Sequence, residues 1–267
     1  MKTAEETRNS RLPQLTYRVW RVWRRNFDVF MKTYKVNFFP PLLEPIFYLA
    51  AFGLGLGQFV SGFPGSGSFI QFIAPALVSI TIMYSSFFEC TYGSFVRMYY
   101  QKTFDAIIST PISIEEVIAG EMLWGATRSL VGGSIVLAVV AAFGLISSPL
   151  AILVPLVAFA TGLTFSAIGM CFTSLAHNID FFNYPQFLFI TPMFLLSGTF
   201  FPITVLPSFM QVIAYAALPL THTVTFARAL MFGSFNTTLI LSLVWITVVT
   251  PIFFILAVKL MKRKLIK

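Results

Sequence analysis

The fold is decided by residues 69–116, which read FIQFIAPALVSITIMYSSFFECTYGSFV followed by RMYYQKTFDAIISTPISIEE. The first part, 69–96, has a single charged side chain, Glu89, and is longer than the roughly 20 residues that cross a bilayer as a helix. The second part, 97–116, is polar, contains acidic and basic residues and is broken by a proline. This change predicts a membrane-spanning helix that ends near Arg97 and enters a water-exposed segment.

The composition extends this interpretation to the whole chain. Of the 267 residues, 57% are hydrophobic and 10% are charged, and the mean hydropathy is +0.82. A soluble domain has roughly 25% charged residues, so this chain has too few to cover a water-facing surface. Charge-poor runs long enough to span a membrane lie at 36–60, 69–96, 117–146, 150–175, 181–201 and 238–258. We therefore expect an all-α integral membrane protein with six transmembrane helices, because the alternating strands of a membrane barrel are not seen.

The distribution of basic residues predicts the orientation. Nine of the 18 Lys and Arg residues lie at or before Lys35, and five lie between Lys259 and Lys267. Since basic residues favour the cytoplasmic side, we expect both termini and the segment 97–116 in the cytoplasm. The net charge of +8 then follows from topology and gives no reason to expect a nucleic-acid partner. The first dozen residues are polar, so no cleavable signal peptide is expected.

The N-terminal part divides into a polar tail, 1–13, and an amphipathic segment, 14–35. Aromatic and basic residues recur there at helical spacing but on opposite faces, among them Trp20, Trp23, Arg21 and Arg25. This pattern predicts a helix in the cytoplasmic membrane interface, with its bases toward anionic lipid headgroups. A transmembrane domain, 36–260, and a basic tail, 261–267, complete the expected organisation.

Three ionisable residues are expected inside the membrane at similar depth: Glu44, Glu89 and Arg128. Such residues are costly in lipid and are usually paired or functional. We expect Arg128 to neutralise one or both carboxylates, either as a clamp between spans or as the polar lining of a substrate path. Prolines 40, 41 and 45 predict that the first span, 36–60, is kinked near Glu44.

The segment 202–233 is divided by Pro202, Pro207 and Pro219 into apolar pieces too short to cross a bilayer. This predicts re-entrant or interfacial helices on the outer side, before the last span. His222 lies there without a neighbouring carboxylate or second ligand, so ordinary packing is the expected role. The two cysteines, which fall within expected spans, predict neither a disulfide nor a metal site.

The polar segment 97–116 contains a second helical signal. Residues 102–109 can form a short helix with Phe104, Ile107 and Ile108 on one face, and the proline at 111 must end it. The motif Ser113-Ile-Glu-Glu116 is a capping box that starts the next helix. An isolated apolar face at the cytoplasmic side predicts a soluble partner.

Several motifs are absent from the chain. It contains no G-x-x-x-x-G-K-[ST] nucleotide-binding loop, no H-E-x-x-H and no G-x-S-x-G. A catalytic constellation is not found, and we expect no enzyme and no cofactor bound by this chain. An ion- or proton-coupled carrier or channel, and a membrane enzyme of lipid or glycan metabolism, remain the alternatives to a partner-driven transporter.

Three stretches resemble the ABC-2 family of ATP-binding-cassette transporter permeases, most closely its NodJ-like branch of nodulation-factor and oligosaccharide exporters. They are LLEPIFYLAAFGLGLG (42–57), FDAIISTPISIEEVIAGE (104–121) and LLSGTFFPITVLP with LPLTHTVTFARAL (195–207 and 218–230). The resemblance implies a bacterial inner-membrane, multi-pass exporter subunit. Its substrate would be a lipo-oligosaccharide, a polysaccharide or a hydrophobic drug, and the aromatic content of 16% suits an amphipathic cargo and a lipid-facing surface equally.

The resemblance also implies partners and residue roles. Two copies of the permease would join two separate ATPase subunits, which would bind ATP and Mg²⁺, and the substrate path would lie between the permeases. The segment 14–35 would be the connecting helix and 202–233 the outer re-entrant element. The residues implied in coupling to the ATPase are Phe104, Asp105, Ile107, Ile108, Thr110 and Pro111.

Overall fold

The computed structural model describes residues 15–55 and 68–265, and within these ranges the chain is helical without a β-strand. The longer helices are α2 (Val19–Ala50), α3 (Phe69–Phe88), α5 (Ile114–Ala142), α6 (Val154–Leu175), α9 (Ser208–Ala217), α10 (Pro219–Phe232) and α11 (Thr237–Leu265). The short helices are α4 (Thr103–Ile108), α7 (Asn183–Pro185) and α8 (Thr191–Leu196). Four short π-helical segments, called π-turns below, are η2 (Ala51–Gly55), η4 (Glu89–Gly93), η5 (Val96–Tyr100) and η8 (Gln186–Ile190). The short 3-10 helices are η6 (Pro149–Leu153), η7 (Ile179–Phe182) and η9 (Ile203–Val205).

Four described helices are long and apolar enough to cross a membrane: Phe69–Tyr100, Ile114–Ala142, Pro149–Leu175 and Thr237–Leu265. The bent pair α9 and α10 would make a fifth. The all-helical membrane class is thereby confirmed, whereas the predicted count of six is not. The run 181–201 appears as α7, η8 and α8, which reach only about 21 Å at 1.5 Å per residue, and residues 56–60 of the first run lie outside the described part.

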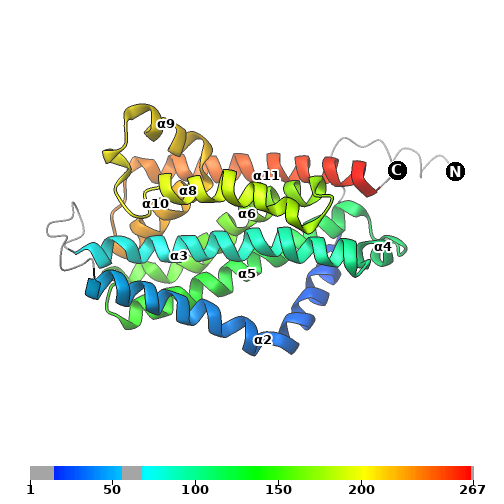
Figure 1. The fold of residues 1–267 in the computed structure, drawn as a ribbon, viewed down its shortest axis with the longest axis horizontal. Coiled ribbons are helices and arrows are strands. Elements are labelled where there is room, and N and C mark those ends of the chain that lie inside the picture. The colour runs from blue at the N-terminus through cyan, green and yellow to red at the C-terminus, as the bar shows by residue number, and fades with distance from the viewer. Residues whose placement is uncertain (1–14, 56–67, 266–267) are drawn as a thin grey trace.

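The helices form an elongated bundle in which most axes follow its long direction (Figure 1). Helix α5 packs against α2, α3 and α6, and α6 packs in turn against α3, α10 and α11. Small residues permit close approach, as is common between membrane helices. At Gly162 of α6, an added Cβ would lie 1.9 Å from Ser129 Oγ, and that hydroxyl donates to the Ala158 carbonyl oxygen at 2.9 Å.

Helix α2 is continuous from Val19 to Ala50, so it crosses the expected boundary between an interfacial helix and a first span. Its ribbon bends, and its first part lies at an angle to the rest (Figure 1). The buried face of that first part consists of Val19, Val22 and Asn26, at helical spacing. These residues pack toward α5, where an added Cβ at Gly120 would come within 2.5 Å of Val22.

The polar segment between α3 and α5 closely follows the sequence prediction. Helix α4 is one residue shorter at each end than the predicted helix, and Lys102 before it has a left-handed φ of 52°. The predicted capping box is confirmed: the Glu116 amide donates to Ser113 Oγ at 3.3 Å, and the Ser113 amide donates to the Glu116 carboxylate at 2.8 Å. The turn between the two helices therefore has a fixed geometry.

The two ends of the bundle differ. Helix α4 lies at one end, and α9 and α10 lie at the other (Figure 1). As the prolines predicted, Pro207 precedes α9 and Pro219 opens α10, and the two helices are bent by 89°. The α4 end has its own apolar core, built around Phe95, Phe104 and Phe182.

Candidate functional site

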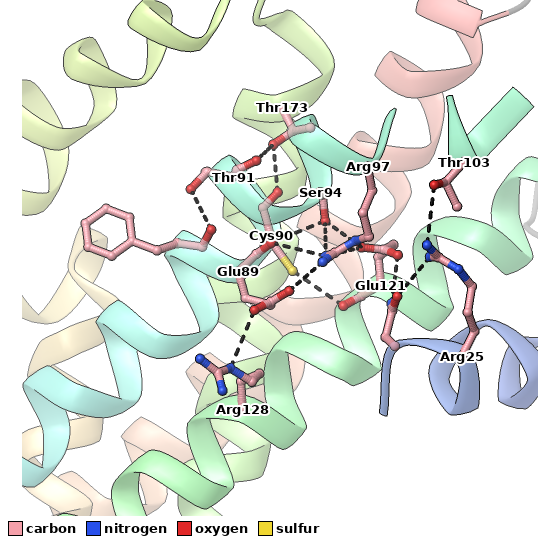
Figure 2. A network of polar contacts seen from close by, with 12 residues as sticks. Arg25, Glu89, Cys90, Thr91, Ser94, Arg97, Thr103, Glu121, Arg128 and Thr173 are labelled. Carbon is pink, nitrogen blue, oxygen red and sulfur yellow. Dashed lines mark hydrogen bonds and ion pairs between the residues drawn. The ribbon is translucent and has the colours of Figure 1, made fainter. Parts of the chain in front are cut away.

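A buried ionic network lies next to α4, between the end of α3, α2 and α5, and is centred on Glu121 and Arg97 (Figure 2). Arg97 Nη2 and Nε lie 2.6 and 3.0 Å from Glu121 Oε2. The same oxygen accepts a hydrogen bond from Ser94 Oγ at 2.7 Å. The Glu121 side chain is fully buried, so its charge depends on these donors rather than on water.

Glu89 extends the network from Arg97 to Arg128. Its Oε1 accepts a hydrogen bond from Arg97 Nη1 at 2.8 Å, and its Oε2 lies 3.5 Å from Arg128 Nε. Arg128 also lies over the ring of Phe30, with its guanidinium carbon 4.9 Å from the ring centroid. The network thus pairs two carboxylates with two guanidinium groups inside the bundle.

Two π-turns bring these side chains together. Residues 89–93 and 96–100 form η4 and η5, which continue α3 with a wider turn. Eight residues separate Glu89 from Arg97, which at 100° per residue would leave them about 80° apart on an α-helix. Because a π-turn has more residues per turn, the two residues come onto the same face. Gly93 lies between them, and an added Cβ there would be 2.9 Å from Glu89 Oε1.

Helix α2 joins the network through two adjacent polar residues. Asn26, which is buried, donates from Nδ2 to Glu121 Oε1 at 2.8 Å. Arg25 reaches Thr103 Oγ1, at the first residue of α4, over 3.4 Å (Figure 2). Burial lowers the pKa of Arg25, while the nearby charge of Glu121 raises it. Glu121 and its neighbours therefore connect α2, the end of α3, α5 and α4.

A second set of polar contacts holds the turn between α4 and α5 from outside. Arg18 donates from Nη1 to the Pro111 carbonyl oxygen, and Thr16 donates from Oγ1 to Glu116 of the capping box. On the other side, Lys262 near the end of α11 pairs with Glu115. The residues just before α2 and the C-terminal part of α11 thus clamp this turn and the first turn of α5.

The residues implied in ATPase coupling differ in exposure. Asp105, Thr110 and Pro111 are exposed, and Ile107 and Ile108 are half-buried. Phe104 is completely buried in the apolar core of this end. The expectation that Phe104 forms part of an exposed apolar face is therefore wrong, because its ring is needed to attach α4 to the bundle.

The expected membrane cluster is brought together only in part. Glu89 and Arg128 are adjacent, as described above, but the side chain of Glu44 lies outside the described residues. Sequence reasoning missed Arg97, Glu121 and Asn26. The available signal for Glu121 was an acidic residue inside the expected span 117–146, two turns after the Ser113 cap of α5.

The expected interfacial aromatics show a mixed arrangement. Trp20 is exposed and stacks on Trp23 at a centroid distance of 4.1 Å. Trp23 is half-buried, and its indole nitrogen donates to Thr127 Oγ1 at 2.8 Å. Arg21 is exposed on the same helix. The aromatic residues therefore contact α5 as well as the outside of the bundle.

At the other end, His222 is buried and fully hydrogen-bonded. Its Nδ1 lies 2.9 Å from Ser242 Oγ, and its Nε2 lies 3.0 Å from the Tyr215 carbonyl oxygen. The ring also stacks on Trp245 at 4.5 Å. Among the described residues, no group of three His, Cys, Asp or Glu side chains is placed to bind a metal ion. The contacts of His222 are those of a packed residue joining α10 to α11.

Comparison with known proteins finds a matching family and several relatives. Residues 17–232 match the model of the family described as ABC-2 type transporter. The chain is 36% identical over 250 residues to Nodulation protein J of Rhizobium leguminosarum bv. viciae, covering 92% of this chain and 94% of that protein. It is 33% identical over 259 residues to Nodulation protein J of Bradyrhizobium diazoefficiens, covering 96% and 97%.

A more distant relative is the inner membrane transport permease YadH of Escherichia coli, which is 25% identical over 190 residues. That match covers 71% of this chain and 73% of YadH. No solved structure matches the chain.

Proposed function

Because the chain belongs to the ABC-2 type transporter family, as its family match and its Nodulation protein J relatives show, we propose that it is the permease subunit of an ATP-driven exporter. In this proposal it sits in a bacterial inner membrane, where YadH is named as a transport permease. A separate ATPase binds ATP and Mg²⁺ and supplies the energy. The observation that carries the proposal is the attachment of α4 to the buried network.

The exposed part of α4 and its following turn would receive the ATPase. Asp105, Thr110 and Pro111 are accessible, while Phe104 fixes the other side of the helix in the bundle. A six-residue helix has little stability of its own, so its position depends on these tertiary contacts. A displacement of α4 must consequently move the residues packed against it.

The network would carry that displacement to the spans. Thr103 contacts Arg25 of α2, and the capping box links the turn directly to α5. Glu121 then binds Asn26 of α2 and Arg97 at the end of α3. Because a buried ion pair is costly to separate, the three helices would move together rather than slide past one another.

The substrate path is proposed to lie between two copies of the permease. A cavity of about 170 Å³ between α2, α3 and α8 supports an amphipathic substrate, because aromatic side chains form most of its wall. They are Tyr48, Phe52, Tyr84, Phe194 and Phe200. Such a surface offers apolar area together with the phenolic hydroxyl groups of two tyrosines. This chemistry suits one part of a lipo-oligosaccharide or of another lipid-linked molecule, because a volume of about 170 Å³ is too small for the whole molecule.

The test uses the permease purified with its ATPase and reconstituted in vesicles. Asp105→Arg and Thr110→Arg change exposed residues of α4 and its following turn and should reduce both co-purification of the ATPase and ATP-dependent transport. Ser208→Asp, an exposed substitution at the opposite end of the bundle, is the control and should leave both unchanged.

The same assay separates the alternative functions. Transport by the permease alone, driven by an ion or proton gradient, would refute the ATP-driven proposal in favour of a carrier or channel. Bond cleavage or group transfer by the purified chain would instead indicate a membrane enzyme.

A further inference from the structure

A cavity of about 510 Å³ lies at the end of the bundle opposite α4, where α9, α10 and the start of α11 meet (Figure 1). Its volume is in the range of pockets that bind small molecules. Two of its lining residues, Phe72 and Val224, are buried. Three others, Thr204, Ser234 and Asn236, are exposed. The cavity therefore reaches from the surface into the bundle, so that a ligand can enter it from outside.

Among the described residues, Arg228 is the one charged residue that lines this cavity, and it lies on the same face of α10 as Val224 and Phe232. Neighbouring segments fix its orientation. Its Nη2 donates to the Gly198 carbonyl oxygen at 2.6 Å, and its guanidinium carbon lies 3.9 Å from the centroid of the Phe72 ring. The guanidinium group is thus held in place before a ligand arrives, which lowers the entropic cost of binding.

The charge of Arg228 has no counter-ion in the described part of the chain, where none of the four ion pairs includes it. After Glu121 the sequence contains one further acidic residue, Asp180. Asp180 belongs to η7, at the α4 end with the core around Phe182. An arginine of this kind in an apolar bundle is costly, and it usually pairs with another group or marks a functional site.

One nitrogen of the Arg228 guanidinium remains available to a ligand. Within the described residues its hydrogen bonds both come from Nη2, to the carbonyl oxygens of Gly198 at 2.6 Å and Phe72 at 3.5 Å. Nε is buried and unpaired there, so a ligand cannot reach it. Nη1 donates no hydrogen bond in the same part of the chain, and it is not a buried atom. An accessible guanidinium N–H suits the oxygen of a phosphate, which offers three strong acceptors.

The wall of the cavity offers hydrogen bonds beyond Arg228. Of its residues with hydroxyl or amide side chains, only Thr225 uses that group in a hydrogen bond within the described residues, from Oγ1 to the Thr221 carbonyl oxygen at 2.8 Å. The side chains of the others can therefore bind a ligand. These residues are Thr204, Tyr215, Ser234, Asn236 and Thr238. Because a phosphate alone fills only part of the cavity, the remaining wall suits a ligand that also carries several hydroxyl groups.

We propose that this cavity binds a phosphorylated polyol, with a phosphate oxygen at Arg228 Nη1 and the polyol hydroxyls along the hydroxyl and amide groups of the wall. A sugar phosphate and the glycerol phosphate headgroup of a membrane lipid share this chemistry. The inference goes beyond the proposed function, since binding here requires neither the ATPase nor transport.

The test measures binding of glucose 6-phosphate to the purified full chain in detergent by isothermal titration calorimetry, with glucose and inorganic phosphate as comparison probes. Glucose 6-phosphate should bind at least about tenfold more tightly than either, because it alone can contact both Arg228 and the polar wall. Arg228→Gln should weaken its binding at least about tenfold, as expected for the loss of a charge-assisted hydrogen bond. Arg24→Gln removes the same group from an exposed position on α2 and should leave binding unchanged. Unchanged binding by Arg228→Gln, or equal affinity for the three probes, would refute the site.

A second pair of variants keeps Arg228 and provides the test if Arg228→Gln does not fold. Asn236→Trp fills the mouth of the cavity from an exposed position and should weaken binding of glucose 6-phosphate at least about tenfold. Phe235→Trp changes the neighbouring residue, which is also exposed but does not line the cavity, and it should bind like the wild type. Equal affinities of these two variants would overturn the proposal.

A lipid experiment distinguishes the two sources of the ligand. Native mass spectrometry compares phosphatidylglycerol with phosphatidylcholine of the same acyl chains, which has a phosphate but no polyol in its headgroup. A preference for phosphatidylglycerol that Arg228→Gln removes, and that glucose 6-phosphate competes away, assigns the site to a lipid headgroup. Equal binding of the two lipids, together with tight binding of glucose 6-phosphate, assigns it to a water-soluble ligand.

Discussion

Replacement of Glu121 by Gln tests whether the buried network holds the α4 end together. The substitution keeps the shape of the side chain but removes a carboxylate that accepts hydrogen bonds from Asn26, Ser94 and Arg97. Arg97 and Arg128 would then share the single carboxylate of Glu89. Because removing one partner leaves an uncompensated buried charge, the free energy of unfolding should fall by about 3–5 kcal/mol.

Unfolding is measured on the purified protein in one detergent, by thermal or denaturant-induced loss of its monodisperse gel-filtration peak. The matched control is Glu115→Gln, which breaks the pair with Lys262, where the lysine side chain is 37% exposed. That pair should contribute less than about 1 kcal/mol, since exposed ion pairs are weak. Equal effects of Glu121→Gln and Glu115→Gln would refute the reasoning.

A double-mutant cycle separates the interaction energy between Arg97 and Glu121 from the effect that each substitution has on its own. Arg97→Met combined with Glu121→Gln removes one positive and one negative charge, so the network keeps the balanced pair Glu89 and Arg128. The double variant should be less destabilised than the sum of the single variants by about 2 kcal/mol. Strict additivity would show that the two side chains do not stabilise each other.

Four further predictions follow from the described contacts. Phe104→Ala should lower the free energy of unfolding by about 3–5 kcal/mol because the ring is fully buried, and a similar loss from the half-buried Ile107→Ala would contradict this. Ser113→Ala should cost about 1 kcal/mol by removing the cap of α5, whereas Ser113→Asp should retain it. The charge swap Glu89→Arg with Arg128→Glu should not restore stability, because the new arginine at position 89 would face Arg97. In the wild type, Arg97 Nη1 lies 2.8 Å from Glu89 Oε1. Full rescue in the same unfolding assay would be inconsistent with that contact. Gly162→Ala should destabilise by about 1–3 kcal/mol through its clash with Ser129, and Gly162→Ala combined with Ser129→Gly should recover part of the loss.

Hydropathy and turn chemistry predicted those parts of the fold that depend on local sequence. Four of the six apolar runs correspond to helices that are long and apolar enough to cross a membrane. The capping box at Ser113 and the break at Pro219 were also found where expected. The first apolar run, 36–60, does not form a separate helix, because α2 continues through the expected boundary at residue 35. Local propensity does not reveal where a continuous helix bends or leaves the membrane interface.

The candidate site was harder to predict, since it depends on helix rotation. Arg97 follows an apolar run, and counting residues assigned it to water, whereas the π-turns direct it back toward Glu121. Phe104 was assigned to an exposed face because its spacing from Ile107 and Ile108 places the three apolar side chains on one side of a short helix. The spacing of apolar residues on a six-residue helix does not show which side is covered by the bundle.

The clamp around the turn between α4 and α5 has a consequence for protein engineering. Residues far apart in the chain, Arg18 with Pro111 and Lys262 with Glu115, hold this one turn in place. A chimera that takes only α4 from a relative would import the proposed docking surface without the residues that orient it. The smallest exchangeable module is therefore discontinuous, and it has to include the start of α2 and the end of α11 together with the turn itself.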